Sequence, residues 1–368
     1  MKLNELSIKN FRGYDEAIID FDDELNVIIG RNDVGKSTIL DALEIFFNGE
    51  NRDAQVKIET DDFNVNCGEE DKKIIISCIF DVGDKDVIID STNKTNLKDE
   101  FLLNKDGKLE IIKVWNCNKE KISASDLKIY LKAYYPQIEE PLINLTDVKL
   151  RRSLEEIRDG IEDYDDIHRN KNSEMRRAIH DYHISKGCEL EEMYVDLKKN
   201  DGKDMWMAIK NNLPLYFLFK SDRSNTDTDA EVQDPLKIAT KEALAGIQEQ
   251  LSEIERIVER QVKEVGQATI DKLKEFDEEI ADELRTDLIL KPWDSIFSFT
   301  LAGDDGIPLN KRGSGIRRLM LLSYFRAEAE RLVEQDGLQR SVIYAIEEPE
   351  TSQHPNFQKM IIESLITI

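Results

Sequence analysis

The chain has 368 residues, of which 40% are hydrophobic and 35% are charged, and its formal net charge is −25. This length allows two or three domains with a sizeable core, and a charged fraction above the usual value of roughly 25% indicates long solvated helices. The negative field repels phosphate backbones, which disfavours binding of nucleic acid by general attraction.

The first 50 residues predict the order strand, strand, strand, loop, helix. Residues 3–11 alternate apolar and polar side chains, as a half-buried strand does, and residues 17–21 are a second strand candidate. The apolar run 25–30 predicts a buried strand that ends in a glycine turn. Apolar residues at helical spacing then predict a helix that begins near Ser37 and stops at Asn48-Gly49.

The middle of the chain changes from strands to helices. Residues 72–115 predict an antiparallel, strand-rich subdomain. Residues 124–212 predict mostly helices, one of them over residues 189–200. Residues 213–220 are a buried-strand candidate, and residues 236–288 predict one long amphipathic helix or two end to end.

The last segment alternates strands and helices again. The pattern predicts strands over residues 295–304 and 340–350, and helices over residues 315–335 and 356–366.

Residues 30–38 match the phosphate-loop pattern G-x-x-x-x-G-K-[ST]. Its glycines let successive backbone N–H groups face one anion. Lys36 then supplies a charge for the β- and γ-phosphates, Ser37 supplies a hydroxyl for Mg²⁺, and the following helix directs its positive end at the phosphates. The alternative is a chance glycine turn, but an apolar run before the loop and a helix after it favour nucleotide binding. The loop residues expected at the nucleotide are Asn32, Asp33, Gly35, Lys36, Ser37 and Thr38.

An apolar run over residues 341–346 ends in the acids Glu347 and Glu348. Glu347 is expected to hold Mg²⁺ directly or through water, and Glu348 to orient and deprotonate the attacking water, so that Lys36 and Glu348 are the catalytic candidates. The alternative is an ordinary acidic strand end. About 310 residues separate Lys36 from Glu347. Simple P-loop kinases and GTPases place these two elements far closer, so we expect the nucleotide-binding domain to be split by a large insertion.

A Gly-Ser-Gly turn around Ser314 precedes the predicted helix 315–335. Such a turn makes a second anion-binding helix N-terminus; the alternative is a flexible loop with Ser314 as the helix cap. One protomer has no further phosphate to offer, so the turn predicts contact with the γ-phosphate on a partner's phosphate loop. We therefore expect a homodimer that holds ATP between its subunits.

The order of phosphate loop, Gly-Ser-Gly turn and acidic strand resembles an ABC-type ATPase of the SMC/RecF/OLD group. Residues 8–13 are similar to the start of that group, which implies that Arg12 reaches the nucleotide. Arg312-Gly313-Ser314-Gly315 resembles the signature loop, which adds Arg312 and Gly315 to the expected nucleotide contacts. The run 346–350, followed by His354-Pro355, is similar to the OLD family, where Glu replaces the usual Walker B Asp.

The resemblance covers residues 1–65 and 290–368 and implies an α/β fold, an ABC-ATPase head with a mixed sheet that is split by a helical arm. The expected parts are residues 1–145 as the N-terminal half, residues 146–290 as the helical insertion with one buried strand near 213–220, and residues 291–368 as the C-terminal half. The switch-histidine strand of the group and the TOPRIM domain of OLD proteins are expected to be absent. The chain is then either a fragment or a bare ATPase that partners a separate effector.

The implied function is that of a Mg²⁺-dependent ATPase that dimerises around ATP and gates a nuclease or another effector in anti-phage defence. The alternatives are an ATP-sensing scaffold with negligible turnover and a DNA-repair clamp that binds DNA directly. A GTPase is disfavoured because no Asn-Lys-x-Asp motif is present, and a P-loop kinase because no acceptor site or lid is recognisable.

Several features predict no chemistry of their own. His180 and His183 are expected on a helix surface rather than at a metal, and the acidic residues between 227 and 234 in a solvated turn. Residues 220–223 form a polar exit from a strand that could line the nucleotide or a partner. The four cysteines form no CxxC pair, and no signal peptide or spanning run is recognisable, so a cytoplasmic protein is expected.

Overall fold

The computed structural model describes most of the N-terminal part of the chain and selected later segments. It describes residues 1–31, 35–51, 54–68, 72–83, 88–90, 95–220, 243–244, 247–278 and 340–348, and the single residues 293, 323, 327, 331 and 359. The chain divides into two compact units. The first comprises Met1–Ser221, Glu328–Thr351 and Lys359–Ile368, and the second comprises Asp222–Ala327 and Ser352–Gln358.

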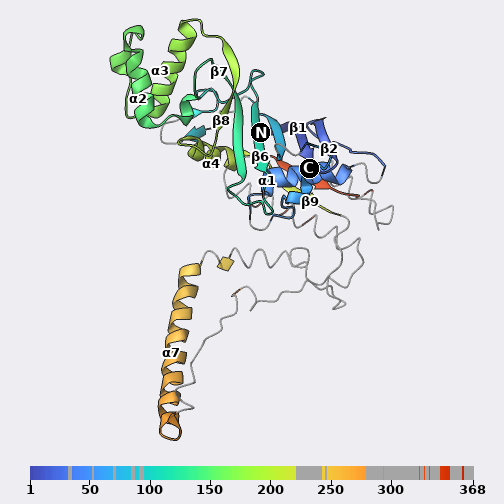
Figure 1. The fold of residues 1–368 in the computed structure, drawn as a ribbon, viewed down its shortest axis with the longest axis vertical. Helices are drawn as coiled ribbons and strands as arrows, with labels where there is room; N and C mark the ends of the chain where they lie inside the picture. Colours follow the sequence, from blue (N-terminus) through green and yellow to red (C-terminus); the bar gives the residue numbers. More distant parts are fainter. Residues whose placement is uncertain are drawn as a thin grey trace. The chain divides into compact units, whose positions relative to one another are not determined.

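The first unit is built on a six-stranded sheet with the order β2-β1-β3-β6-β7-β8 (Figure 1). Every neighbouring pair in it is antiparallel. Buried and half-buried residues alternate along β3 and β6, which is the period of a strand with one face in the core. The strands are β1 (Lys2–Phe11), β2 (Tyr14–Asp20), β3 (Lys73–Asp81), β6 (Leu109–Asn116), β7 (Leu127–Pro136) and β8 (Leu190–Asp196).

A parallel pair of strands brings the C-terminal part of the chain to the N-terminal part. Strand β9 (Leu215–Phe219) pairs in parallel with β10 (Val342–Ile346). Tyr216 on β9 stacks on Phe47 of helix α1 (Lys36–Asn48) with ring centroids 5.4 Å apart. The Tyr216 hydroxyl donates to the Leu40 carbonyl at 2.9 Å. The parallel pair is therefore attached to the helix that follows the phosphate loop.

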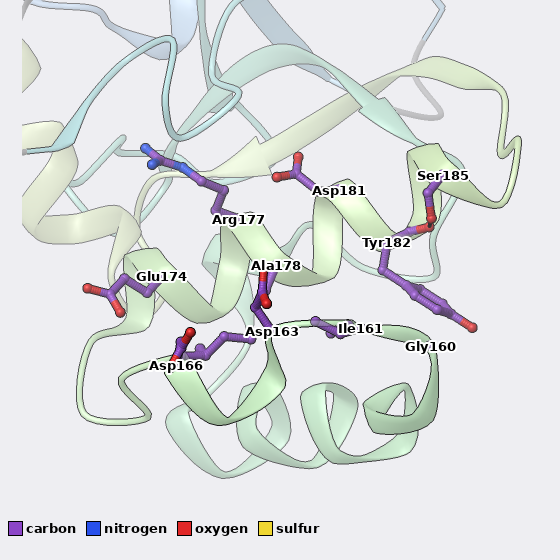
Figure 2. Close-up of a pocket in the computed structure, with 11 residues that line it drawn as sticks. Gly160, Ile161, Asp163, Asp166, Glu174, Arg177, Ala178, Asp181, Tyr182 and Ser185 are labelled. Atoms are coloured by element: carbon purple, nitrogen blue, oxygen red, sulfur yellow. Dashed lines mark hydrogen bonds between the residues drawn. The ribbon is translucent and has the colours of Figure 1, made fainter.

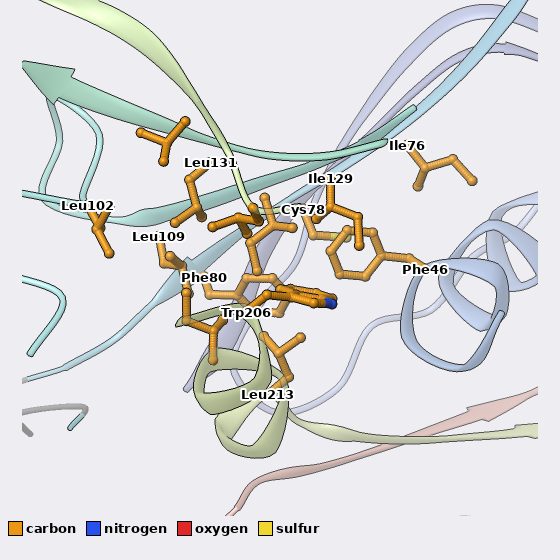
Figure 3. Close-up of a cluster of buried hydrophobic side chains, with 14 of the residues drawn as sticks. Phe46, Ile76, Cys78, Phe80, Leu102, Leu109, Ile129, Leu131, Trp206 and Leu213 are labelled. Carbon is orange, nitrogen blue, oxygen red and sulfur yellow. The ribbon is translucent and has the colours of Figure 1, made fainter. Parts of the chain in front are cut away.

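Helix α1 and helix α4 (Gly202–Asn212) enclose the core together with the sheet. Figure 3 shows Phe46 of α1 and Trp206 of α4 among sheet side chains that include Phe80 and Ile129. Phe46 and Phe80 are fully buried, and their ring centroids lie 6.0 Å apart. Burial of apolar side-chain surface is the main favourable contribution to the free energy of folding. The buried aromatic rings therefore hold α1 against the sheet.

The remaining elements of the described chain lie in both units, and helices α2 and α3 of the first unit also contribute buried residues to this core. In the first unit they are α2 (Asp147–Glu156), α3 (Asn172–Ser185), β4 (Ile88–Asp90), β5 (Thr95–Asn96), and the 3₁₀ turns η1 (Thr60–Asp62), η3 (Leu142–Asn144), η4 (Arg158–Gly160) and η5 (Tyr164–Asp166). In the second unit, α7 (Gln248–Lys274) is a helix of 27 residues. No helix in the described residues is long and apolar enough to cross a membrane.

The α/β class is confirmed, and so are most of the expected elements. Helix α1 ends at Asn48 as expected, with Gly49 at its C-cap. Strands are found over parts of 72–115, over 213–220 and over 340–350, and α7 lies within 236–288. The expected strand 295–304 and the expected helices 315–335 and 356–366 lie almost wholly outside the described residues. The proposed domain boundaries stay predictions.

Three expectations were wrong. Residues 25–30 form no strand, and Val27 and Ile29 are 69% and 87% exposed; a strand needs a partner for its backbone groups, and no described strand pairs with this run. Residues 190–196 form strand β8 rather than a helix, and β7 also replaces expected helix, because pairing across the sheet overrides local helix propensity.

The third correction concerns His180, which was expected on a helix surface. It is only 8% exposed, and its ring stacks on Phe101 with centroids 3.4 Å apart. Burial lowers the pKa of His180 below 6.5. The ring therefore acts as a packing group on the core-facing side of α3.

Candidate nucleotide site

Gly35 lies at the point where the phosphate loop becomes helix α1. Its φ of 93° is in the left-handed region, where a residue with a Cβ is strained. A Cβ at this position would lie 2.9 Å from the Tyr14 hydroxyl oxygen, which itself donates to the Gly35 carbonyl at 3.3 Å. Both the backbone conformation and the close approach of Tyr14 therefore require glycine here.

The Lys36 side chain folds back along the loop. Its ammonium donates to the carbonyls of Gly30 at 2.7 Å and Arg31 at 2.8 Å. The carbonyls of Gly30 and Arg31 thus lie around one positive charge at the first residue of α1. A helix N-terminus with an adjacent ammonium is an arrangement that binds anions. Thr38, the next loop residue expected at the nucleotide, is half-buried on the first turn of α1.

Ser37 and Glu347 are in contact although 310 residues separate them. The Ser37 hydroxyl donates to the Glu347 carboxylate. Glu347 directly follows β10, and its backbone N–H donates to the Phe219 carbonyl on β9 at 2.8 Å, so the strand pair positions it. The structure therefore brings together the two residues that the sequence predicts for Mg²⁺.

The Ser37 and Glu347 pair fits a magnesium ion chemically. A hydroxyl and a carboxylate are hard oxygen ligands, and Mg²⁺ is commonly bound by one or two such protein groups, with water and phosphate completing its shell. Among the described residues no cluster of three or more His, Cys, Asp or Glu side chains could hold a metal.

Glu348 has a strained backbone. Its φ is 45°, in the left-handed region that residues with a Cβ seldom adopt. Such a conformation costs on the order of 1–3 kcal/mol and persists where the surrounding structure holds it, often at functional sites. The strained conformation makes Glu348 a functional candidate on structural grounds.

Arg12 lies in the turn between β1 and β2, also with a positive φ of 49°. Its guanidinium donates through Nη1 to the Asp41 carboxylate at 2.6 Å and through Nε to the Asp62 carboxylate at 2.7 Å. Burial alone would lower the pKa of Arg12, but the hydrogen bonds to Asp62 and Asp41 outweigh burial and raise it. Arg12 is therefore a fixed cation beside α1. The expectation that it reaches the nucleotide stays a prediction.

Asp41 is a site residue that the sequence reasoning missed. It lies one turn after Ser37 on α1, and its side chain is 5% exposed. Besides Arg12 it meets Lys220, whose Nζ lies 2.6 Å from Oδ1 as an ion pair, without the alignment of a hydrogen bond. The available signal was a charged residue among the core-facing positions of a predicted amphipathic helix.

Other expected residues lie outside the described part of the chain. This applies to Asn32 and Asp33 of the phosphate loop and to Arg312, Ser314 and Gly315 of the expected signature loop. A surface hollow on α3 is described, lined by residues such as Asp163, Glu174 and Tyr182 (Figure 2). It contains none of the predicted nucleotide contacts and is a separate feature of the fold.

Comparisons with known proteins place these residues in a family context. A family model described as an AAA ATPase domain matches residues 1–368. Over 47 residues the chain is 51% identical to the DNA double-strand break repair Rad50 ATPase of Archaeoglobus fulgidus, which covers 13% of this chain and 5% of that protein. Over 43 residues it is 44% identical to the DNA replication and repair protein RecF of Flavobacterium johnsoniae, with 12% of each chain covered. The match thus spans only a small share of these relatives.

Two solved structures are also similar. One belongs to work described as structural biochemistry of ATP-driven dimerization and DNA stimulated activation of SMC ATPases, with 18% identity, a TM-score of 0.24, and 36% of this chain and 69% of that chain covered. The other is an SMC head bound to the C-terminal winged-helix domain of ScpA, with 14% identity, a TM-score of 0.27, and 63% and 84% covered. At these TM-scores the likeness carries no structural argument.

Proposed function

This chain belongs to the AAA ATPase domain family, and we propose that its phosphate loop binds ATP and that the chain hydrolyses it with Mg²⁺. The observation that carries the proposal is the contact between Ser37 and Glu347. A phosphate loop needs an acidic partner for the metal and the attacking water, and these two residues come together from opposite ends of the chain. A chance glycine turn would have no reason to meet the end of β10.

In this proposal Lys36 and the N-terminal amides of α1 hold the phosphates, with Asn32, Asp33, Gly35 and Thr38 lining the same loop. Ser37 and Glu347 hold Mg²⁺, which when bound supplies positive charge to the phosphate oxygens. Glu348, whose backbone is held in the left-handed region at the end of β10, is the proposed general base.

Glu348 then accepts a proton from water as the water oxygen bonds to the γ-phosphorus. The bond from that phosphorus to the bridging oxygen breaks, and ADP and phosphate leave.

The subclass that we propose is an ABC-type ATPase of the SMC/RecF/OLD group that dimerises around ATP. Support comes from the Gly-Ser-Gly turn at Ser314, flanked by Arg312 and Gly315, which has the composition of a second anion-binding site. Two copies of a chain with net charge −25 repel each other, so the closed dimer would depend on the bound nucleotide. ATP would then act as a conformational ligand whose hydrolysis reopens the pair.

The proposed biological role is control of a nuclease or another effector in anti-phage defence. It rests on the similarity of residues 346–350 to the OLD family and is an analogy between motifs rather than a consequence of the geometry. The alternatives are an ATP-sensing scaffold with negligible turnover and a DNA-repair clamp that binds DNA directly. The charge of −25 disfavours the clamp.

The test measures ATP turnover and nucleotide affinity for wild type, Lys36→Ala and Glu348→Gln. We expect Lys36→Ala to lower nucleotide affinity at least about tenfold. We expect Glu348→Gln to keep the affinity and to lower turnover by about 10²-fold or more, the usual contribution of a general base.

Lys198→Ala is the matched control for Lys36→Ala. Lys198 also donates to two main-chain carbonyls, those of Ala124 and Leu127, but it lies away from the phosphate loop. If Lys36→Ala binds ATP as wild type does, the proposed site is wrong. If wild type binds ATP but turns it over as slowly as Glu348→Gln, the scaffold alternative is correct.

A further inference from the structure

One buried carboxylate beside the phosphate loop holds two cations that come from distant parts of the chain. Asp41 Oδ2 accepts from Arg12 Nη1 at 2.6 Å, and Oδ1 lies 2.6 Å from Lys220 Nζ. Arg12 has a second carboxylate partner in Asp62 at 2.7 Å. Among the described residues, Lys220 is paired with Asp41. Arg12 is therefore held by two carboxylates and Lys220 by one.

Lys220 lies beside the acidic end of β10. It follows the last residue of β9, Phe219, which is paired with Ile346 in the parallel register. The Phe219 carbonyl also accepts a hydrogen bond at 2.8 Å from the backbone N–H of Glu347, the residue that follows Ile346. Lys220 is therefore the cross-strand neighbour of the acid that contacts Ser37. Its ammonium reaches α1 one turn beyond Ser37, at Asp41.

Exposure distinguishes the lysine from its anchor. The Asp41 side chain is 5% exposed, whereas the Lys220 side chain is 26% exposed. A carboxylate as buried as Asp41 keeps a cationic partner, because an unpaired charge there is costly. Arg12 bonds Oδ2 of Asp41, and Lys220 can keep its ion pair with Oδ1 while it offers its N–H donors to another anion. A lysine suits this role because its flexible stem carries three donors around a compact charge.

We propose that Lys220 recognises the γ-phosphate of a nucleoside triphosphate, and that Asp41 is the positioning residue that holds the ammonium at the edge of the site. This inference rests on the proposed function. Water attack requires that the γ-phosphate face the acids at the end of β10, where Glu348, which holds no metal in the proposed mechanism, would otherwise repel it. Lys220 supplies the compensating positive charge on that side, while Lys36 and the helix N-terminus also serve the phosphates that ADP retains.

The test compares affinities for ADP and for a non-hydrolysable ATP analogue by isothermal titration calorimetry, with Mg²⁺ present throughout. We expect Lys220→Met to weaken binding of the ATP analogue about tenfold, equivalent to about 1.4 kcal/mol. ADP affinity is expected to stay within about twofold of wild type. Lys220→Arg keeps the charge and is expected to retain most of the preference for the triphosphate, which a purely structural role of the lysine stem would not explain.

Lys132→Met is the matched control. The Lys132 side chain is 22% exposed and paired with Glu192 at 2.8 Å, so it resembles Lys220 in burial and pairing but lies on β7. It is expected to leave the ratio of the two affinities unchanged. If Lys220→Met lowers the melting temperature more than Lys132→Met does, the two nucleotide affinities are compared in Lys220→Gln instead.

The outcomes separate the two proposals. If wild type binds neither nucleotide, the proposed function fails and this inference fails with it. If wild type binds the ATP analogue and neutral variants at Lys220 keep its preference over ADP, the inference alone is overturned. A loss of preference in Lys132→Met equal to that in Lys220→Met also overturns it, because the effect would then follow from any lost ion pair.

Discussion

The two ends of helix α1 are both built around lysines, yet they differ in what surrounds the charge. At the N-terminal end, Lys36 is half-buried, Ser37 is exposed, and the ammonium bonds loop carbonyls. At the C-terminal end, Lys113 of β6 is 1% exposed; it donates to the Phe46 carbonyl at 2.8 Å and to Glu50 at 2.5 Å. The first charge is accessible to a ligand and the second is enclosed by protein.

The difference shows how one helix can be both an anchor and a binding element. The Lys113 ammonium lies 5.2 Å from the centroid of the Phe46 ring and 5.1 Å from that of Trp206, and it satisfies a carbonyl in the last turn of α1. Lysine beside the C-terminal carbonyls complements the helix dipole. The C-terminal end is thus fixed to the sheet, which leaves the polar N-terminal end in a defined place for phosphate.

Lys113→Ala is expected to give the largest change in stability. It removes the packed stem, leaves the Phe46 carbonyl without this donor, and takes away the principal partner of Glu50. Removing one partner of a buried pair costs about 3–5 kcal/mol; because Glu50 is 23% exposed, we expect a loss near the lower figure. Chemical denaturation measures it. Nucleotide affinity of the folded variant should be unchanged.

Lys132→Ala serves as the control for this prediction, because its ion pair with Glu192 is more exposed. We expect it to cost less than about 1 kcal/mol. Equal losses in the two variants would show that enclosure of Lys113 adds nothing to its contribution.

Gly35→Ala is expected to give an intermediate loss of stability, together with a loss of nucleotide affinity that is specific to the N-terminal end of α1. Forcing alanine into the left-handed region costs on the order of 1–2 kcal/mol, and the added Cβ would meet Tyr14. Nucleotide affinity should fall at least about tenfold, since the loop must shift.

Gly107→Ala is the matched control for the glycine. Gly107 also has a positive φ, 72°, but an added Cβ there would meet nothing within 4 Å. It should lose similar stability while nucleotide affinity, measured by titration calorimetry, stays at the wild-type value. A loss of affinity in both variants would contradict the role assigned to Gly35.

The smallest expected effect is the loss of stability at the C-terminal end of α1 when the pH is lowered. Burial alone would raise the pKa of Glu50, but the charge and hydrogen bond of Lys113 outweigh burial and lower it below 4.5. The ionised form is therefore favoured in the folded state, so its stabilisation is present above pH 4.5 and is lost as the pH falls through the folded-state pKa.

Glu50→Gln removes this titration. The difference in unfolding free energy between wild type and Glu50→Gln should shrink as the pH is lowered from 6 to 3, by up to about 1 kcal/mol. Denaturation curves at several pH values measure it. A constant difference over that range would mean that Glu50 is not stabilised by Lys113.

The elements that were predicted correctly are those with a strong local pattern. Strand β3 carries a β-branched run, β6 alternates apolar and polar residues, and α1 carries apolar residues at helical spacing between two glycines. Strand β8 was mistaken for a helix because its first half, with Glu191 and Glu192, is rich in helix formers. Only its pairing with β7 makes it a strand, and that partner lies more than fifty residues earlier in the chain.

By itself, the sequence determined the phosphate-loop spacing, the helix that follows it and the acids after an apolar strand, because these depend on residues close together in the chain. The tertiary structure alone decided that Ser37 meets Glu347 and that Asp41 joins Arg12 to Lys220. Such contacts depend on which strands pair and which helix face is buried. Those choices are made by the summed burial of the whole core, which no local pattern records.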